Sequence, residues 1–415
     1  MDHRIYELPN GIRVVHKEVN NTKIAHCGFI LDIGSRDENR GEEGTAHFWE
    51  HMVFKGTQKR KSYHIINRLE SVGGELNAYT TKEKICFYAS VLDKYFEKAI
   101  ELLTDITFYS IFPEKEIEKE RAVILEEMAM YRDIPEDAIQ DDFDGYLFPE
   151  HSLGHNILGN ENSLRSISKR TFQQFLRDNL DTGRIIFSVV GNFSFNKVRK
   201  LAERYISPIP PKKSKLNRNK PRPSKPINIK INKNITQSHC AIGTKAYSTT
   251  DPKRLTFFTL TNLLGGPAMN SRLNMSLREK HGFVYAIDAS YTPYTDIGSF
   301  AIFFGTENKL LGRSTDLVLK EINRVRSTKL SLLQMQRTKN QIIGQLAMAE
   351  ENNTGLMLMM GKSMLDLGRI DTLEEIVHQL ISITSTEMQD IANEIFAKEN
   401  LNYLSFIPNN YGNHQ

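Results

Sequence analysis

Two stretches of the sequence decide the fold: RLESVGGELNAY at residues 68–79 and LREKHGFVYA at residues 277–286. In each stretch a helical pattern ends at a glycine, and a strand-like run begins directly after it. Glycine suits the end of a helix because it reaches the left-handed backbone conformation without the steric cost of a Cβ atom. The two stretches lie in opposite halves of a 415-residue chain. We therefore expect the chain to contain two copies of one domain.

The order of the elements around the two stretches is also the same. In the first half we expect a hairpin at 6–19, strands at 24–33, 76–80, 84–92 and 184–191, helices at about 43–55, 61–72, 93–108, 114–132 and 164–179, and a short helix that ends at 206. In the second half we expect strands at 226–234, 237–246, 283–292, 298–304 and 401–407, and helices at about 252–264, 271–280, 308–325, 329–350, 353–366 and 385–397. Strands followed by a block of helices are typical of an α+β domain. The predicted fold is two duplicated α+β domains, each an antiparallel sheet packed with helices.

Residues 207–226 separate the two halves and contain six prolines. Proline disfavours a helix and favours extended backbone. The segment also carries seven basic residues and no acidic one: Lys212, Lys213, Lys215, Arg218, Lys220, Arg222 and Lys225. We predict an N-terminal domain at 1–206, a basic proline-rich linker at 207–226 that acts as a flexible hinge, and a C-terminal domain at 227–415.

The composition excludes several classes of protein. The chain is 40% hydrophobic and 25% charged, which is typical of globular domains. Subtracting the seven linker cations from the net charge of +4 leaves −3, so the positive charge forms no broad surface for nucleic acid. We also expect no membrane span and a cytoplasmic location, because no long apolar run and no signal-like N-terminus is present.

The sequence HFWEH at residues 47–51 carries the most specific chemistry. On a helix, His47, Glu50 and His51 share one face because they stand at positions i, i+3 and i+4. Two imidazoles one turn apart can occupy adjacent corners of a tetrahedral zinc site, and Glu50 can act on a metal-bound water. Thr45 is the expected N-cap of this helix. The alternative is a surface helix with two incidental histidines.

A third ligand is expected on the helix at about 114–132. Glu120 and Glu127 are seven residues apart and therefore project from the same helix face, whereas Glu126 points about 100° away. From the spacing alone, a solvated acidic face remains the alternative.

The segment GTAHFWEHMVFKGT at residues 44–57 resembles the inverted zincin signature of the pitrilysin/insulinase metallopeptidases. It is most similar to the short-chain branch that includes the β subunit of mitochondrial processing peptidase. The resemblance implies one Zn²⁺ per chain, held by His47, His51 and Glu127, the last standing 76 residues after His51 as in the family. It also implies that Glu120 is a supporting carboxylate beside these ligands.

The same resemblance implies the activity. The chain is expected to be a zinc-dependent metalloendopeptidase that hydrolyses unfolded peptides or precursor leader segments inside a closed chamber. Glu50 would be the general base for a metal-activated water. Some relatives have lost the motif and serve as scaffold subunits, but His47, Glu50, His51 and Glu127 are all present in this chain.

The resemblance also implies residues that contact the substrate. Asn77 and Ala78 match the family's edge strand, which binds an extended peptide through its main chain. Arg278 and Tyr285 match the family's Arg/Tyr pair, in which Tyr stabilises the tetrahedral intermediate and Arg grips the substrate backbone. From the residues alone, Asn77 could instead cap a turn and Tyr285 could be a structural strand residue.

The family encloses its chamber with four such domains, and this chain has two. The resemblance therefore implies a homodimer in which the Arg/Tyr pair of one subunit completes the zinc site of the other. Two questions about function stay open from the sequence. One alternative to a peptidase is a scaffold subunit without activity. Among peptidases, the chain could be a dedicated processing enzyme or a general oligopeptide scavenger.

Overall fold

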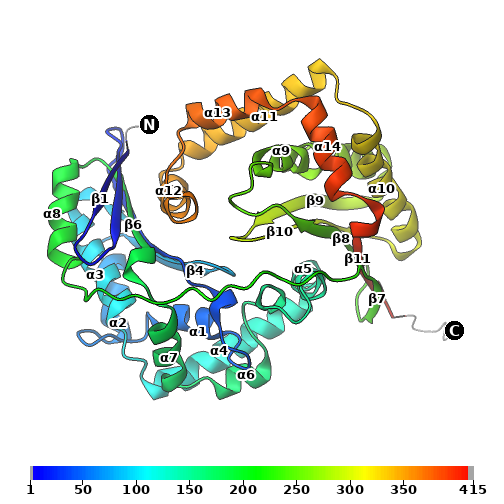
Figure 1. The fold of residues 1–415 in the computed structure, drawn as a ribbon. Helices are drawn as coiled ribbons and strands as arrows, with labels where there is room; N and C mark the ends of the chain where they lie inside the picture. The colour runs from blue at the N-terminus through cyan, green and yellow to red at the C-terminus, as the bar shows by residue number, and fades with distance from the viewer. Residues whose placement is uncertain (1–2, 410–415) are drawn as a thin grey trace. The chain divides into compact units, whose positions relative to one another are not determined.

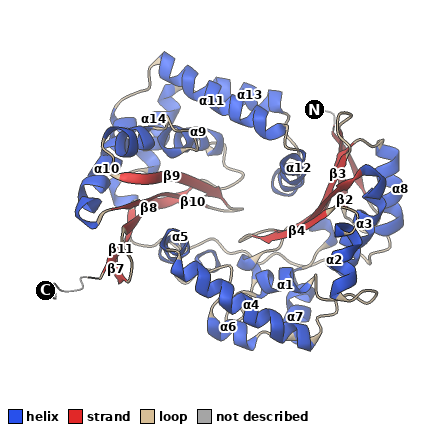
Figure 2. Ribbon diagram, turned by 180° about the vertical axis from the view of Figure 1, so that it is seen from behind, coloured by secondary structure: helices blue, strands red, loops and turns tan. Residues whose placement is uncertain are grey.

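The computed structural model describes residues 3–409, which divide into two compact units (Figure 1). Unit 1 is formed by residues 3–128, 155–219 and 347–372, and unit 2 by residues 129–154, 220–346 and 373–409. Each unit contains one sheet with helices packed on it (Figure 2). Among residues 3–409, no helix is both long and apolar enough to cross a membrane.

The sheet of unit 1 has six strands in the order β1-β2-β6-β3-β5-β4. Their bounds are β1 His3–Glu7, β2 Arg13–Glu18, β3 Ile24–Leu31, β4 Glu75–Thr80, β5 Ile85–Leu92 and β6 Ile185–Gly191. All neighbours are antiparallel except β2 and β6. A parallel pair needs a long crossover connection, and β6 returns to the sheet only after the helices that follow β5. Strand β4 is one edge of this sheet.

The sheet of unit 2 has five strands in the order β7-β11-β8-β10-β9. Their bounds are β7 Asn228–Lys233, β8 Ser238–Ala246, β9 Val284–Pro293, β10 Gly298–Thr306 and β11 Asn402–Pro408. The parallel pair is β7 and β11, which matches β2 and β6 in unit 1. The two orders agree strand for strand once β1 is set aside, so the predicted duplication is confirmed. Each observed sheet departs from the predicted antiparallel sheet only in this one parallel pair.

Most of the predicted helices are present. The helices of the first half are α1 Thr45–Met52, α2 Ser62–Glu70, α3 Phe96–Phe108, α4 Glu114–Asp133, α5 Pro135–Leu147, α6 Glu161–Ser166, α7 Lys169–Asn179 and α8 Phe195–Tyr205. Those of the second half are α9 Arg254–Gly265, the π-helical segment Asn274–Lys280, α10 Leu311–Ser327, α11 Leu332–Glu350, α12 Asn353–Leu367, α13 Leu373–Ser382 and α14 Ser385–Ile395. Helices α5, α6 and α13 were not predicted from the sequence.

Each unit receives one helix from the other half of the sequence. Helix α12 packs on β3 and β6 of unit 1, where Met357 and Met360 join a buried cluster with Ile30 and Ile186. On the opposite face of that sheet, Phe29 packs against Phe108 of α3. Both faces of the sheet are therefore covered, one by helices of its own half and the other by α12.

Helix α5 plays the same part in unit 2. It packs on β8, β10 and β11, and Phe143 lies in a buried cluster with Ala241 and Leu404. The neighbouring strand residues Cys240 and Ile242 point to the other cluster, with helices α9 and α10. The compact units are thus discontinuous along the chain, since α5 and α12 are exchanged between the two halves.

The predicted linker has no helix or strand between residues 210 and 227. Its first part is nevertheless fixed to unit 1 by Arg218, whose side chain is 3% exposed and forms ion pairs of 2.7 Å with both Asp32 and Asp37. The guanidinium of Arg36 donates a hydrogen bond of 2.8 Å to the carbonyl of Asn219. The segment expected to be a free hinge is therefore anchored as far as Asn219.

Candidate metal centre

Helix α1 is short and is oriented by its buried aromatic side chains. Phe48 and Trp49 are fully buried and make edge contacts with Phe172 and Phe87, with ring centroids 5.2 and 5.3 Å apart. The N-cap is Gly44, with φ 93°, where an added Cβ would lie 2.5 Å from the carbonyl oxygen of Leu158. Only glycine fits this start of the helix.

The expected N-cap Thr45 is therefore wrong by one residue. Thr45 already belongs to the helix, and its hydroxyl donates a hydrogen bond of 2.6 Å to the carbonyl of Glu42. The backbone N–H groups of Gly44 and Ala46 instead donate to the carboxylate of Glu38, at 2.9 and 2.7 Å. Sequence reasoning missed Glu38 because it acts from outside the helix.

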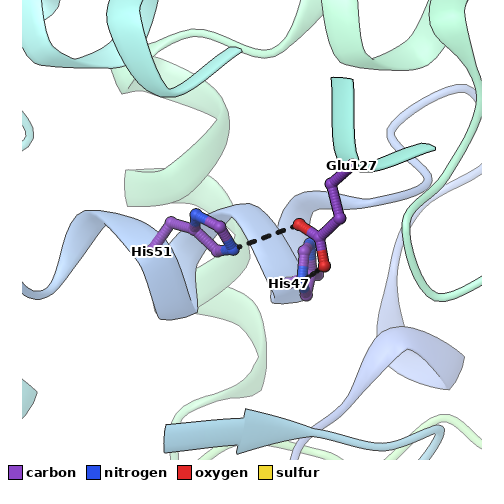
Figure 3. A group of neighbouring side chains, drawn as sticks. All are labelled: His47, His51 and Glu127. Atoms are coloured by element: carbon purple, nitrogen blue, oxygen red, sulfur yellow. Dashed lines mark ion pairs between the residues drawn. The ribbon is translucent and has the colours of Figure 1, made fainter. Parts of the chain in front are cut away.

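The structure brings the three predicted ligands together (Figure 3). One ligand atom from each of His47, His51 and Glu127 lies within 4.8 Å of the others. The Nε2 atom of His47 is 3.8 Å from Glu127 Oε1, and that of His51 is 3.6 Å from Glu127 Oε2. Tetrahedral zinc with bonds of about 2.1 Å separates its ligand atoms by about 3.4 Å, so this donor set fits the ion.

The electrostatics of His47 suit a metal ligand. The side chain is buried, and burial together with the neighbouring His51 lowers the pKa of His47 to about 3. The ring is therefore neutral at physiological pH and offers the lone pair that a metal ion needs.

Glu120 supports His51 from the far side of the ring. Its Oε2 atom is 3.2 Å from His51 Nδ1, and its Oε1 atom is 2.6 Å from the ammonium of Lys55. Burial favours a higher pKa for Glu120, but the hydrogen bonds from His51 and Lys55 hold this pKa below its ordinary value. With Nδ1 bonded to Glu120, the Nε2 atom of His51 faces Glu127. Lys55 is a further residue that the sequence did not single out.

Glu50 lies beside the ligands and is held by a hydrogen bond from another element. The hydroxyl of Thr80, at the end of β4, donates to Glu50 Oε2 at 2.5 Å. Burial raises the pKa of Glu50, and the bond from Thr80 opposes this rise. Thr80 stands 30 residues away in sequence, so the pairing became visible only in the structure.

A cavity of about 280 Å³ opens beside this carboxylate. Its walls are Glu50, His51, Phe54, Lys55, Leu76, Asn77, Ala78 and Glu120. The predicted substrate-binding residues Asn77 and Ala78 thus line the same cavity as Glu50. They lie on β4, whose outer edge pairs with no other strand among residues 3–409.

Arg278 and Tyr285 lie together in unit 2, whereas the ligands lie in unit 1. The Arg278 guanidinium is 5.6 Å from the centre of the Tyr285 ring. Tyr285 is the second residue of the edge strand β9 and is 85% exposed, so it contributes little to the core. Exposure of this kind leaves its hydroxyl free to meet a ligand.

Comparison with solved structures supports the fold of the whole chain. A protein of Pseudomonas fluorescens described as a peptidase M16 inactive domain covers 98% of this chain, and 98% of its own chain is matched, with a TM-score of 0.91 at 17% identity. A protease from Helicobacter pylori covers 98% of this chain, with 99% of its own chain matched, at a TM-score of 0.90 and 19% identity.

Comparison of sequences identifies the family. Residues 13–161 match the family model described as insulinase (peptidase family M16), and residues 166–342 match that of the peptidase M16 inactive domain. An uncharacterized zinc protease of Rickettsia felis is 34% identical, with 95% of each chain covered. Another, of Bacillus subtilis, is 30% identical, with 95% of this chain and 96% of the relative covered. The chain belongs to the insulinase family of zinc metallopeptidases, peptidase family M16.

Proposed function

We propose that the chain is an endopeptidase that hydrolyses unfolded peptides or precursor leader segments, with Glu50 as its general base. The observation that carries the proposal is the grouping of His47, His51 and Glu127 within 4.8 Å, with Glu50 on the same helix as both histidines. The cavity at Glu50 is bordered by the edge strand β4, where an extended peptide could add.

Each residue of the site has a role in this mechanism. Bound zinc would supply a Lewis acid and would lower the pKa of a water ligand towards about 7. Thr80 holds one oxygen of Glu50. The other oxygen, Oε1, takes a proton from the attacking water and later passes it to the leaving amine. Glu120 holds the ring of His51 in the orientation that the metal site requires.

Substrate recognition at β4 favours unfolded chains. A peptide that adds to a sheet edge must be extended, and its main-chain hydrogen bonds carry little information about sequence. Asn77 and Ala78 would hold this peptide. Arg278 and Tyr285 would act on the same substrate from a second copy of the chain, in a homodimer that closes a chamber.

The direct test is cleavage of a mixed pool of unstructured peptides of different lengths by the intact protein and by Glu50→Gln, both with measured zinc content. Glu50→Gln should keep its zinc but lose most turnover, because only proton transfer is removed. Equal cleavage by both proteins would refute the role of Glu50. Zinc at full occupancy without cleavage of any peptide would favour a scaffold or a chain that needs a partner.

The same experiment separates the two kinds of peptidase. Many cut sites spread over the pool would support a general scavenger. Cleavage limited to a few related sequences would support a dedicated processing enzyme.

A further inference from the structure

Helix α1 receives its N-terminal cap from a residue outside the helix. Gly44 has no side chain to serve as a cap, and the hydroxyl of Thr45 is bonded to the carbonyl of Glu42. Glu38 instead accepts two backbone hydrogen bonds, from Gly44 N at 2.9 Å and from Ala46 N at 2.7 Å. Each oxygen of the carboxylate thus binds one of the N–H groups that the first turn of a helix leaves unpaired.

Glu38 is itself held on a fixed support. It follows the short 3-10 helix Ser35–Asp37, whose backbone is bonded to the turn between β4 and β5: Ser35 N donates to Thr81 O at 3.2 Å and Arg36 N donates to Lys82 O at 2.7 Å. Asp37, the preceding residue, pairs with the buried Arg218. The loop that carries Glu38 is therefore tied to the sheet and to the linker.

The position of the cap matters because His47 is the third residue of a helix of only eight. Short helices depend on their ends and on packing, since few hydrogen bonds hold each turn. The first turn carries His47, whereas His51 lies in the last turn and is held separately by Glu120. Loosening of the first turn would therefore displace His47 relative to His51 and Glu127.

We propose that Glu38 is a positioning residue that sets the affinity of the site for zinc by fixing the first turn of α1, and hence His47. The role rests on the proposed zinc site, but it does not depend on peptide cleavage. Glu38 contacts the helix backbone and reaches the metal only through His47.

The test is a titration of zinc against a competing chelator with wild-type protein, Glu38→Ala, Glu38→Gln and the control Glu43→Gln. Loss of a residue that orients a ligand typically lowers metal affinity by about 10- to 100-fold, and we expect this loss for Glu38→Ala. Glu38→Gln should lie between Glu38→Ala and wild type, because its amide oxygen can still accept one of the two bonds.

The control removes a carboxylate charge at the same end of α1 without removing a cap. Glu43 precedes Gly44, and its Oε1 accepts a hydrogen bond from Gly41 N, outside the helix. Glu43→Gln should bind zinc within about twofold of wild type, since no ligand is displaced. Circular dichroism and thermal unfolding of the metal-free proteins define the temperature at which all variants are folded, and the titrations are carried out there.

Two outcomes would overturn the role of Glu38. One is wild-type zinc affinity in folded Glu38→Ala or, if that variant does not fold, in Glu38→Gln. The other is an equal loss in Glu38→Gln and Glu43→Gln, which would assign the effect to charge alone. Failure of the wild-type protein to bind zinc would instead refute the proposed function, and wild-type binding without cleavage would leave the role of Glu38 intact.

Discussion

Each unit contains an equivalent pair of helices, but different side chains connect the two helices in each unit. In unit 1, α1 and α4 meet through His47, His51 and Glu127, whose ligand atoms lie within 4.8 Å of one another. In unit 2, the equivalent helices α9 and α11 are joined by a hydrogen bond of 2.9 Å from the amide of Asn262 to the side-chain oxygen of Gln345.

The difference separates two contributions to the site. The fold determines where the two helices lie, and a few side chains determine whether the helix pair can bind a metal ion. Strand order and helix order are shared, so the fold alone places one helix against the other. A neutral amide pair satisfies itself without a ligand. Two imidazoles and a carboxylate at these distances offer three donor atoms to one cation. Among residues 3–409, the side-chain group that could hold a metal ion therefore lies in unit 1.

The largest expected effect comes from removing a ligand from the contact between α1 and α4 in unit 1. His51→Ala removes one ligand and also leaves Glu120 without its imidazole partner. Zinc affinity should fall by more than about 100-fold, beyond the loss typical of a residue that only supports a ligand, and peptide cleavage should be lost with it. Zinc analysis and the peptide assay on the same sample check both. Retention of stoichiometric zinc at wild-type affinity would remove His51 from the site.

A mixing experiment tests whether unit 2 completes the site of a second copy. Glu50→Gln and Tyr285→Phe should each be nearly inactive alone. If the Arg/Tyr pair acts in trans, a mixed dimer regains one intact site, so random exchange in an equal mixture should restore about a quarter of wild-type activity. An equal mixture that stays inactive, although exchange of labelled subunits is complete, would place the pair and the zinc site on the same chain.

The next largest effect is expected on stability, from the packing of α12 against the sheet of unit 1. A Cβ atom on Gly361 would lie 2.4 Å from Ile30 Cδ1 on the buried face of β3. Gly361→Val should therefore destabilise the protein by about 1–3 kcal/mol through overpacking. Chemical denaturation measures this cost.

The matched control is Gly344→Val on α11, where a Cβ meets no atom of the described residues within 4 Å. Valine has a higher helix propensity than glycine, so this variant should be as stable as wild type or slightly more stable. Equal destabilisation of the two variants would mean that α12 does not depend on the close approach at Gly361.

The smallest expected effect comes from removing the hydrogen bond between α9 and α11 in unit 2. Asn262→Ala removes one partly buried hydrogen bond, which costs about 1 kcal/mol. Zinc affinity and cleavage should stay at the wild-type level, because Asn262 lies in unit 2 and the ligands lie in unit 1. A clear loss of zinc in this variant would contradict the separation of roles between the two helix pairs.

The local pattern in the sequence was sufficient to place the ligands on shared faces. His47, Glu50 and His51 stand at helical spacing, and Glu120 and Glu127 stand two turns apart on a second helix, as the structure has them. The strands were also predictable, because their apolar runs and turns are local signals.

Contacts between distant segments were not predictable in this way. Thr80 bonds Glu50, and Glu38 caps α1, yet neither pairing follows any periodic pattern. Helix α5 shows the limit most clearly. Its buried residues Ile139, Phe143 and Leu147 are spaced by four, which indicates an apolar face, but spacing does not say which sheet that face will cover.

The exchange of α5 and α12 changes what the linker can do for the protein. A cut between Asn219 and β7 would break only one of the five places where the chain passes between the units. The N-terminal fragment would contain α5, which covers one face of the sheet of unit 2. The C-terminal fragment would contain α12, which covers one face of the sheet of unit 1. A nicked chain is thus a complex of two interlocked fragments, and each fragment made alone would expose an apolar sheet face that only its complement can cover.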